Sequence, residues 1–328
     1  MQRGPADADW MAAAIALSRR GRPASAPNPN VGCIVVGDGR VVARGWTQAG
    51  GRPHAEAAAL AAALAAAGDT ARDATAYVTL EPCAHESPRG PACSDLLIAA
   101  GIARVVIAAQ DPDPRTDGKG IARLQAAGIE VVFNVLPAEA RAAMAPWWTR
   151  HTERRPFVTL KLATSLDGAI AMADGSSRWI TGDRARAHGH LERAQHQAIL
   201  VGRGTLDADA PKLDVRLPGL EDRSPKKLVL TSGTAPGGWT AVASPDAIDD
   251  VDSVLVEGGA GAASAFLAAD RVDRLLLYRA PILIGGGKPA LGDIGLADLA
   301  GAHGRWRLSD SRLLGSDRLD VYERVREG

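Results

Sequence analysis

Two short segments constrain the fold of this chain more than any other feature. They are "HAEAAAL", which begins at His54, and "EPCAHESPRGPAC", which begins at Glu81. A catalytic zinc ion usually has three ligands of the His, Cys or carboxylate type, with a fourth position left for water. His54, Cys83 and Cys93 supply three such ligands, so the fold must bring the two segments together.

Both segments are expected at the N-termini of helices. The first opens a helix over residues 55–67, and the two cysteines flank the entrance of a helix over residues 94–100. The partial positive charge of a helix N-terminus lowers the pKa of a thiol and favours thiolate ligands. Glu56 is not needed as a ligand and remains as a carrier of protons. An H-x-E motif followed by Pro-Cys and a further Cys is typical of zinc deaminases.

Strands and helices alternate through the first part of the chain, which predicts a sheet with helices packed on its faces. The expected strands cover residues 31–37, 41–46, 75–80, 104–110 and 129–135, and further helices cover about 8–20, 121–127 and 137–149. A short link joins the first two strands and predicts an antiparallel hairpin. Cys33 lies inside the first strand and is expected to be a small core residue.

A domain boundary is expected near the charged cluster 150–155, after which Pro156 precedes a new apolar strand. We therefore predict two α/β domains, residues 1–150 and 151–328. In the second domain, strands are expected over 157–163, 198–202, 226–232, 253–259 and 274–286, with helices over 183–195 and 261–269.

Charge and cysteine content exclude several classes of protein. Lys plus Arg equals Asp plus Glu, at 38 each, and aromatic residues make up 4% of the chain, so no basic or aromatic strip indicates a nucleic-acid partner. No apolar stretch is long enough to cross a membrane, and the N-terminus does not resemble an export signal. Three cysteines form an odd set, which favours metal or catalytic use in a reduced compartment. We expect a cytoplasmic protein.

The second domain lacks the G-x-G-x-x-G fingerprint of dinucleotide-binding folds. The segment "LVEGGAGAASAFL" is nevertheless suited to phosphate, because a strand that ends at Glu257 leads through small residues directly into a helix. Exposed backbone N–H groups at such a helix start bind phosphate. A tight strand-to-helix turn without a ligand is the alternative.

The first domain resembles the deaminase half of the bifunctional riboflavin-biosynthesis deaminase/reductase family. The resemblance is carried by "PNPNVGCIVV", "HAEAAAL", "TAYVTLEPCAH" and the segment from "ACSDLL" to "AAGIEV", which includes "QDPDP". It implies a cytidine-deaminase-like three-layer α/β/α fold. It also implies that His54, Cys83 and Cys93 bind zinc, that Glu56 transfers protons, and that the substrate is approached by Asn28, His85 and Lys119.

The loop between the two cysteines departs from the family pattern C-x-H-x-G-R-T-P-P-C. Here "CAHESPRGPAC" is one residue longer and lacks T-P-P. Arg89 is the candidate that remains for anion binding in this loop, and a solvated surface arginine is the alternative.

The second domain resembles the reductase half of the same family, through "VTLKLATSLDGAIAMADGSSRWITG", "LERAQHQAILVGRGTLDADAPKLDVR" and "LVEGGAGAASAFLAADRVDRLLLYRAPILIGG". The resemblance implies a dihydrofolate-reductase-like α/β fold that uses NADPH. The residues that it places at the cofactor are Ala163, Trp179, Thr205, Asp209, Gly259, Ala260, Gly261, Ala262, Ala263, Ser264 and Ala265. Those that it places at the substrate are Ser177, Arg193, Leu213, Arg216 and Glu257.

This half departs from the family pattern A-D-D-P-x-L-T, because it reads "ADAPKLDVR". Ala210 replaces the second acid, Asp214 replaces a hydroxyl residue, and the segment 217–247 is short. An alternative hypothesis is therefore a deaminase whose second domain binds its ligands but does not reduce.

Together the resemblances imply a bifunctional enzyme of riboflavin synthesis that acts on a small pyrimidine ribose phosphate. The first domain would deaminate 2,5-diamino-6-ribosylamino-4(3H)-pyrimidinone 5′-phosphate, and the second would reduce the ribosyl side chain to ribityl with NADPH. We expect a homo-oligomer, either a dimer or a tetramer. A nucleic-acid module sharing the zinc site is disfavoured by the zero net charge. A purely structural zinc module would leave Glu56 without a task.

Overall fold

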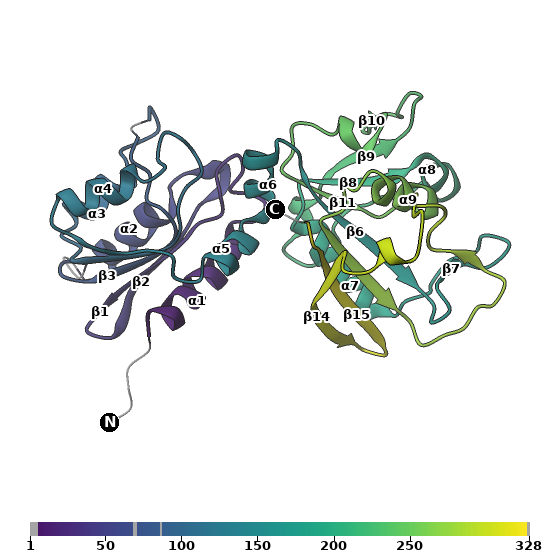
Figure 1. Ribbon diagram of the computed structural model, residues 1–328, viewed down its shortest axis with the longest axis horizontal. Coiled ribbons are helices and arrows are strands. Elements are labelled where there is room, and N and C mark those ends of the chain that lie inside the picture. The colour runs from purple at the N-terminus through teal and green to yellow at the C-terminus, as the bar shows by residue number, and fades with distance from the viewer. Residues whose placement is uncertain (1–5, 68–70, 86, 327–328) are drawn as a thin grey trace. The chain divides into compact units, whose positions relative to one another are not determined.

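The computed structural model describes residues 6–67, 71–85 and 87–326, and the chain divides into two compact units. Unit 1 covers Met1–Arg154 and unit 2 covers Arg155–Gly328, so the division falls inside the charged cluster 150–155. Figure 1 shows that each unit has its own sheet with helices against it. None of the helices in the described part of the chain is long and apolar enough to cross a membrane.

The sheet of unit 1 has five strands in the order β2-β1-β3-β4-β5. Their bounds are β1 (Gly32–Gly37), β2 (Arg40–Trp46), β3 (Thr75–Leu80), β4 (Arg104–Ala109) and β5 (Glu130–Val132). Strand β1 is antiparallel to both β2 and β3, whereas β3, β4 and β5 are parallel to one another. The predicted hairpin between the first two strands is confirmed.

Six α-helices of unit 1 are described, and together with the sheet they make three layers. They are α1 (Asp7–Ser18), α2 (Ala55–Ala67), α3 (Cys93–Ala99), α4 (Lys119–Ala126), α5 (Pro137–Ala143) and α6 (Ala145–Glu153). Helix α3 contacts both α2 and α4, and α1 contacts α5 (Figure 1).

Two glycines fix the faces of the sheet on which α1 and α2 lie. A Cβ atom on Gly32 would lie 2.2 Å from Ala14 O of α1, and one on Gly45 would lie 2.3 Å from Ala55 O and 2.4 Å from Ala59 N of α2. Gly45 pairs with Cys33, so these two residues share a face, and Gly32, the neighbour of Cys33, points to the opposite face. Helices α1 and α2 therefore pack on opposite faces, both at very close range.

Alanine in α2 serves this close approach. Ala55, Ala59 and Ala63 are buried against the sheet, whereas Leu64 is 71% exposed. The buried positions recur every four residues, which places them along one side of a helix. The alanine-rich sequence is thus a thin packing face that lets α2 lie directly on β2.

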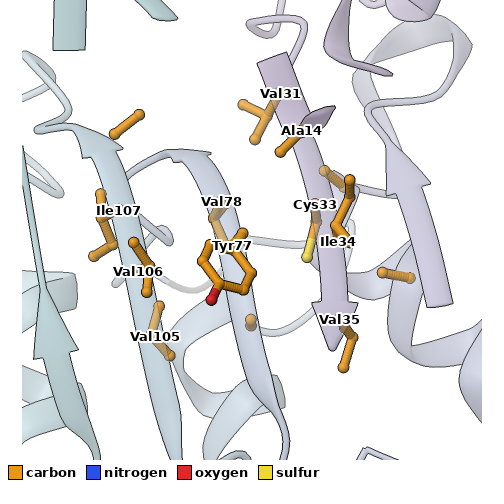
Figure 2. Packing of buried hydrophobic residues seen from close by; sticks show 14 of the residues in the cluster. Ala14, Val31, Cys33, Ile34, Val35, Tyr77, Val78, Val105, Val106 and Ile107 are labelled. Atoms are coloured by element: carbon orange, nitrogen blue, oxygen red, sulfur yellow. The ribbon is translucent and has the colours of Figure 1, made fainter. Parts of the chain in front are cut away.

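The core of unit 1 lies between its sheet and these helices. Figure 2 shows Cys33, Ile34 and Val35 of β1 beside Tyr77 and Val78 of β3. Cys33 is fully buried in this cluster, so its prediction as a core residue is confirmed.

The main sheet of unit 2 has eight strands in the order β10-β9-β8-β11-β6-β12-β15-β14. The first six strands of this order, from β10 through β9, β8, β11 and β6 to β12, are parallel to one another. Strands β15 and β14 extend the sheet as an antiparallel hairpin. The bounds are β6 (Phe157–Thr164), β8 (Ala198–Gly202), β9 (Lys226–Leu230), β10 (Thr240–Val242), β11 (Ser253–Val256), β12 (Arg274–Arg279), β14 (Trp306–Leu314) and β15 (Asp317–Arg324).

Shorter elements complete unit 2. A separate two-stranded sheet pairs β7 (Ala169–Ala171) with β13 (Lys288–Pro289). The α-helices are α7 (Asp183–Ala194), α8 (Arg203–Asp209) and α9 (Ala260–Ala268). Single 3-10 turns cover Glu221–Arg223, Pro245–Ala247 and Ala300–Ala302 in unit 2, and Arg19–Gly21 and Ala49–Gly51 in unit 1.

Two sequence-based predictions of long elements were wrong. The helix expected over residues 137–149 is split into α5 and α6 at Met144, because Pro146 in the first turn of α6 has no backbone N–H with which to continue the hydrogen bonds of α5. The strand expected over residues 274–286 ends at Arg279, since Pro281 has no N–H with which to continue a ladder.

Candidate functional site

The fold brings together the three residues that the sequence predicts as zinc ligands. The ligand atoms of His54, Cys83 and Cys93 all lie within 4.8 Å of one another. His54 Nδ1 is 3.2 Å from Cys93 Sγ and 3.6 Å from Cys83 Sγ. Three nitrogen and sulfur ligands converging in this way fit a zinc ion with one position open.

Local structure at α3 holds the two sulfur atoms in place. Cys93 is the first residue of α3, and its backbone N–H donates to Cys83 Sγ at 3.3 Å. Ser94 fixes the preceding loop, because its hydroxyl donates to the Cys83 carbonyl oxygen at 3.1 Å. Hydrogen bonds from Cys93 and from His54 lower the pKa of the Cys83 thiol, whereas the interaction with Cys83 and burial raise the pKa of Cys93, so the pair favours a single thiolate.

Glu56 lies beside the ligands but is not one of them. Its side chain is almost fully buried in the first turn of α2 and lines the cavity next to His54. Burial raises the pKa of this carboxyl. A buried carboxyl of this kind is suited to accepting and returning a proton.

Asn28 connects the zinc cluster to the turn that precedes α2. Its Nδ2 donates to the Gly51 carbonyl oxygen at 3.0 Å and lies 2.9 Å from His54 Nε2. Asn28 therefore contacts the ring of His54 at the nitrogen that does not face the cysteines.

The cluster opens into a cavity of about 550 Å³ in unit 1. Of the predicted substrate residues, Asn28 and His85 line this cavity, and Arg89 lines it as well. Lys119 is not among the described residues that line it, because it begins α4 and its Nζ donates to the Pro114 carbonyl oxygen at 2.7 Å.

Several lining residues were missed at the level of sequence. Glu81 is buried, and its carboxylate accepts backbone N–H groups of Asp111, Gly118, Gly120 and Ile121, which holds the loop before α4. The position of Glu81 two residues before a cysteine ligand was the available signal.

Other cavity residues come from the loop after β4 and from α6. Burial raises the pKa of Asp111 to about 7, and Asp113 is paired with Arg115 at 2.5 Å. Trp147 and His151 of α6 line the same cavity, with their ring centroids 4.2 Å apart. No short motif marks these residues, because they approach the site only in the folded chain.

Unit 2 contains a separate cavity of about 490 Å³. Nine predicted site residues line it: Ala163, Trp179, Thr205, Asp209, Gly259, Ser177, Arg193, Arg216 and Glu257. Leu213, Ala262 and Ala263 are buried in hydrophobic clusters instead. Ala260, Gly261, Ser264 and Ala265 belong to α9, where Ser264 accepts the backbone N–H of Gly292 at 2.8 Å.

Glycines at the turn into α9 allow its close packing. A Cβ atom on Gly258 would lie 2.5 Å from Ala262 Cβ. The backbone N–H of Gly259 donates to Thr205 Oγ1 at 3.1 Å, so the turn is tied to α8. This glycine-dependent turn at a helix start lines the cavity and is suited to an anionic group.

Three charged residues that line the same cavity, Lys161, Arg193 and Glu257, form an ion cluster. Arg193 forms a bidentate pair with Glu257, at 2.8 Å from Nε and 2.9 Å from Nη2, and Lys161 Nζ lies 3.7 Å from Glu257 Oε2. Burial alone would raise the pKa of Glu257, but Lys161 and Arg193 lower it to about 2. Lys161, which also lies 5.7 Å from the ring centroid of Tyr278, was missed, although a lysine inside the apolar strand "FVTLKLA" was a usable signal.

Two family models match the chain. Residues 5–109 match the cytidine and deoxycytidylate deaminase zinc-binding region, and residues 156–236 and 247–319 match the RibD C-terminal domain. The zinc cluster lies in the first match, and the second match contains most of the residues around the unit 2 cavity.

Similar proteins cover nearly the whole chain. The riboflavin biosynthesis protein RibD of Escherichia coli is 38% identical, over 95% of this chain and 97% of its own length, and that of Haemophilus influenzae is 35% identical over 95% of each. Among solved structures, a diaminohydroxyphosphoribosylaminopyrimidine deaminase/5-amino-6-(5-phosphoribosylamino)uracil reductase from Thermotoga maritima has a TM-score of 0.87 and 33% identity, with 97% of this chain and 99% of that chain covered. Acinetobacter baumannii RibD has a TM-score of 0.84 and 33% identity, with 98% and 99% covered.

Proposed function

The chain belongs to the RibD family of riboflavin biosynthesis proteins, and from this premise we propose the roles of individual residues in its two sites. It is a bifunctional enzyme, with a cytidine-deaminase-like unit that deaminates a pyrimidine ribose phosphate and a second unit that reduces the ribosyl side chain. The observation that carries the residue roles is the convergence of His54, Cys83 and Cys93 beside the buried carboxyl of Glu56.

In the deaminase site, His54, Cys83 and Cys93 would hold zinc, which would supply a Lewis acid that lowers the pKa of water. Glu56 takes a proton from the attacking water and gives it to the amine of the ring carbon, so that ammonia leaves and a carbonyl oxygen replaces it. Asn28 keeps the ring of His54 in place, and the walls of the cavity position the pyrimidine.

The test of this assignment is to separate metal binding from proton transfer. Glu56→Gln and Glu56→Ala should retain zinc at the wild-type ratio and lose deamination by at least about 100-fold, because only the proton carrier is removed. Zinc content is measured on the same preparations as ammonia release. Loss of zinc from Glu56→Gln would mean that Glu56 acts as a ligand, and undiminished deamination would mean that it has no role in the reaction.

In the reductase site, Gly259 at the turn into α9, together with Thr205 and Trp179, would hold NADPH. The substrate lies over Lys161, Glu257 and Arg193, and Arg216 at the cavity rim binds its phosphate. When bound there, NADPH would supply the hydride for C1′ of the opened sugar. Lys161 lines the cavity, lies 3.7 Å from Glu257 and can donate a proton to the sugar oxygen. These placements are supported by the cavity lining and by the ion cluster.

Two further assignments concern the protein as a whole. We propose a cytoplasmic enzyme, supported by the free thiols of Cys33, Cys83 and Cys93. We also propose a homo-oligomer, a dimer or a tetramer. It is supported by exposed leucines on β14 at the edge of the large sheet, where Leu308 is 52% and Leu313 is 74% exposed.

A further inference from the structure

Two arginines connect the loops that border the deaminase cavity. Arg52 lies in the turn before α2, and its Nη2 donates to Ser87 Oγ at 3.0 Å, in the loop between the two cysteine ligands. Arg89 lies in that second loop, and its Nη1 donates to the Gly50 carbonyl oxygen of the first at 3.0 Å. Each arginine thus contacts the loop that carries the other, and both line the cavity.

These two side chains retain donors for a ligand. A guanidinium group has five N–H donors, of which the contacts above use one in each residue. The Nε of Arg52 is buried and has no hydrogen-bond partner among the described residues. A buried donor without a partner is costly, so an acceptor that enters the cavity would be stabilised there.

Two carboxylates of the same cavity, those of Glu81 and Asp113, are held by other groups. Glu81 accepts four backbone N–H groups of the loop before α4. Asp113 pairs with Arg115, which lowers the pKa of Asp113 to about 2. Within the described ranges, no ion pair joins Arg52 or Arg89 to a carboxylate.

We propose that Arg52 and Arg89 form an anion clamp for the phosphate of the deaminase substrate, and that Arg52 selects phosphorylated over unphosphorylated pyrimidine ribosides. Guanidinium groups bind phosphate through two parallel hydrogen bonds, which a hydroxyl group cannot replace. Because the clamp bridges both loops, a bound phosphate also fixes the cavity wall. This inference rests on the deaminase function proposed above and adds to it a subsite and a specificity residue.

The experiment compares deamination of the pyrimidine ribose phosphate with that of the same compound lacking phosphate, and takes the ratio of the two kcat/KM values. Charge-assisted hydrogen bonds of this type predict a fall in the ratio of about 10- to 100-fold in Arg52→Ala and in Arg89→Ala. Arg52→Lys keeps the positive charge but lacks the paired N–H donors of the guanidinium group. Its ratio of kcat/KM values should therefore lie between those of Arg52→Ala and the wild type. Zinc content and the midpoint of thermal unfolding are measured for each variant.

Two controls separate anion binding from bracing of the loops. Ser87→Ala removes the acceptor of Arg52 but no cation, and should lower the ratio much less than Arg52→Ala. Arg40→Ala, at the far end of β2 from the cavity, should leave activity and ratio unchanged. An equal loss on both substrates in Arg52→Ala, or the same fall in Ser87→Ala, would overturn the clamp.

The clamp can also be tested apart from turnover. Inorganic phosphate should bind wild-type protein by calorimetry and bind Arg52→Ala about 10-fold or more weakly. If wild-type protein bound phosphate in this way but released no ammonia, the proposed deamination would fail while the clamp stood. Equal phosphate binding by the two proteins would overturn the clamp alone.

Discussion

At the scale of single residues, the ion cluster in unit 2 shows how burial and charge oppose each other. Glu257 has an 8% exposed side chain, which disfavours its charge, yet Lys161 and the bidentate Arg193 keep it ionised. The pKa of Glu257 in the folded chain, about 2, is lower than the 4.5 of an unperturbed glutamate. The stability that this difference contributes is present above pH 4.5 and is lost as the pH falls towards 2.

Glu257→Gln should therefore destabilise unit 2 in a pH-dependent way. At pH 7 the loss is expected to be about 3 kcal/mol, because two cations lose their buried counter-charge. The difference from wild type should shrink as the pH is lowered through the window above, since the wild-type carboxylate is then protonated as well. Urea unfolding at several pH values measures the difference in the free energy of unfolding between the variant and the wild type. Asp222→Asn, at an exposed site, is the control, and a gap between Glu257→Gln and wild type that did not change with pH would contradict the account.

At the scale of elements, the close packing of α2 on β2 fixes the position of two site residues of unit 1. The approach depends on Gly45 in the strand and on Ala55 and Ala59 in the helix. His54 and Glu56 lie at the start of this helix, so any shift of α2 moves one zinc ligand and the proton carrier together.

Ala59→Leu should displace α2 and lower both stability and zinc content. Leucine and alanine have similar helix propensities, so the expected loss of about 1–3 kcal/mol comes from overpacking. Ala62→Leu places the same side chain on the exposed face of the same helix and should change stability by less than about 0.5 kcal/mol. Thermal unfolding and metal analysis check both variants. Equal behaviour of the two would contradict the packing argument.

The elements also show what the sequence could predict. Strands with continuous apolar runs, such as Thr75–Leu80 and Ala198–Gly202, were predicted at their observed bounds, because burial on both faces leaves a strong pattern. The hairpin of β14 and β15 was not predicted. Most residues of β14 are exposed at the sheet edge, so its sequence lacks a regular apolar alternation.

Site residues divide in the same way. The zinc ligands lie in short motifs of residue types that commonly bind metal, so they could be predicted from the sequence alone. Arg52 and Lys161 contact partners far away in the chain, Ser87 and Glu257, and only the folded structure shows these contacts. Leu213 was assigned to the substrate by resemblance, whereas its side chain packs in a hydrophobic cluster.

At the scale of the whole molecule, the chain combines two units with different chemistry, each with its own sheet, core and cavity. The deaminated product of unit 1 is the compound that unit 2 reduces, so the two reactions have a fixed order. Ala210 and the segment 217–247 depart from the family sequence pattern, but Asp209, Arg193 and Glu257 still line the cavity of unit 2. Nothing in this arrangement favours a unit that binds without reducing.

The central claim, two ordered reactions in one chain, is tested most directly by a coupled assay on the purified zinc-loaded protein. With 2,5-diamino-6-ribosylamino-4(3H)-pyrimidinone 5′-phosphate and NADPH present, ammonia release should precede NADPH oxidation. Glu56→Gln should stop both, and NADPH oxidation should return when the deaminated intermediate is supplied to that variant. Failure of Glu56→Gln to oxidise NADPH with this intermediate, while wild type does so, would contradict independent sites; failure of wild type itself would contradict the bifunctional account.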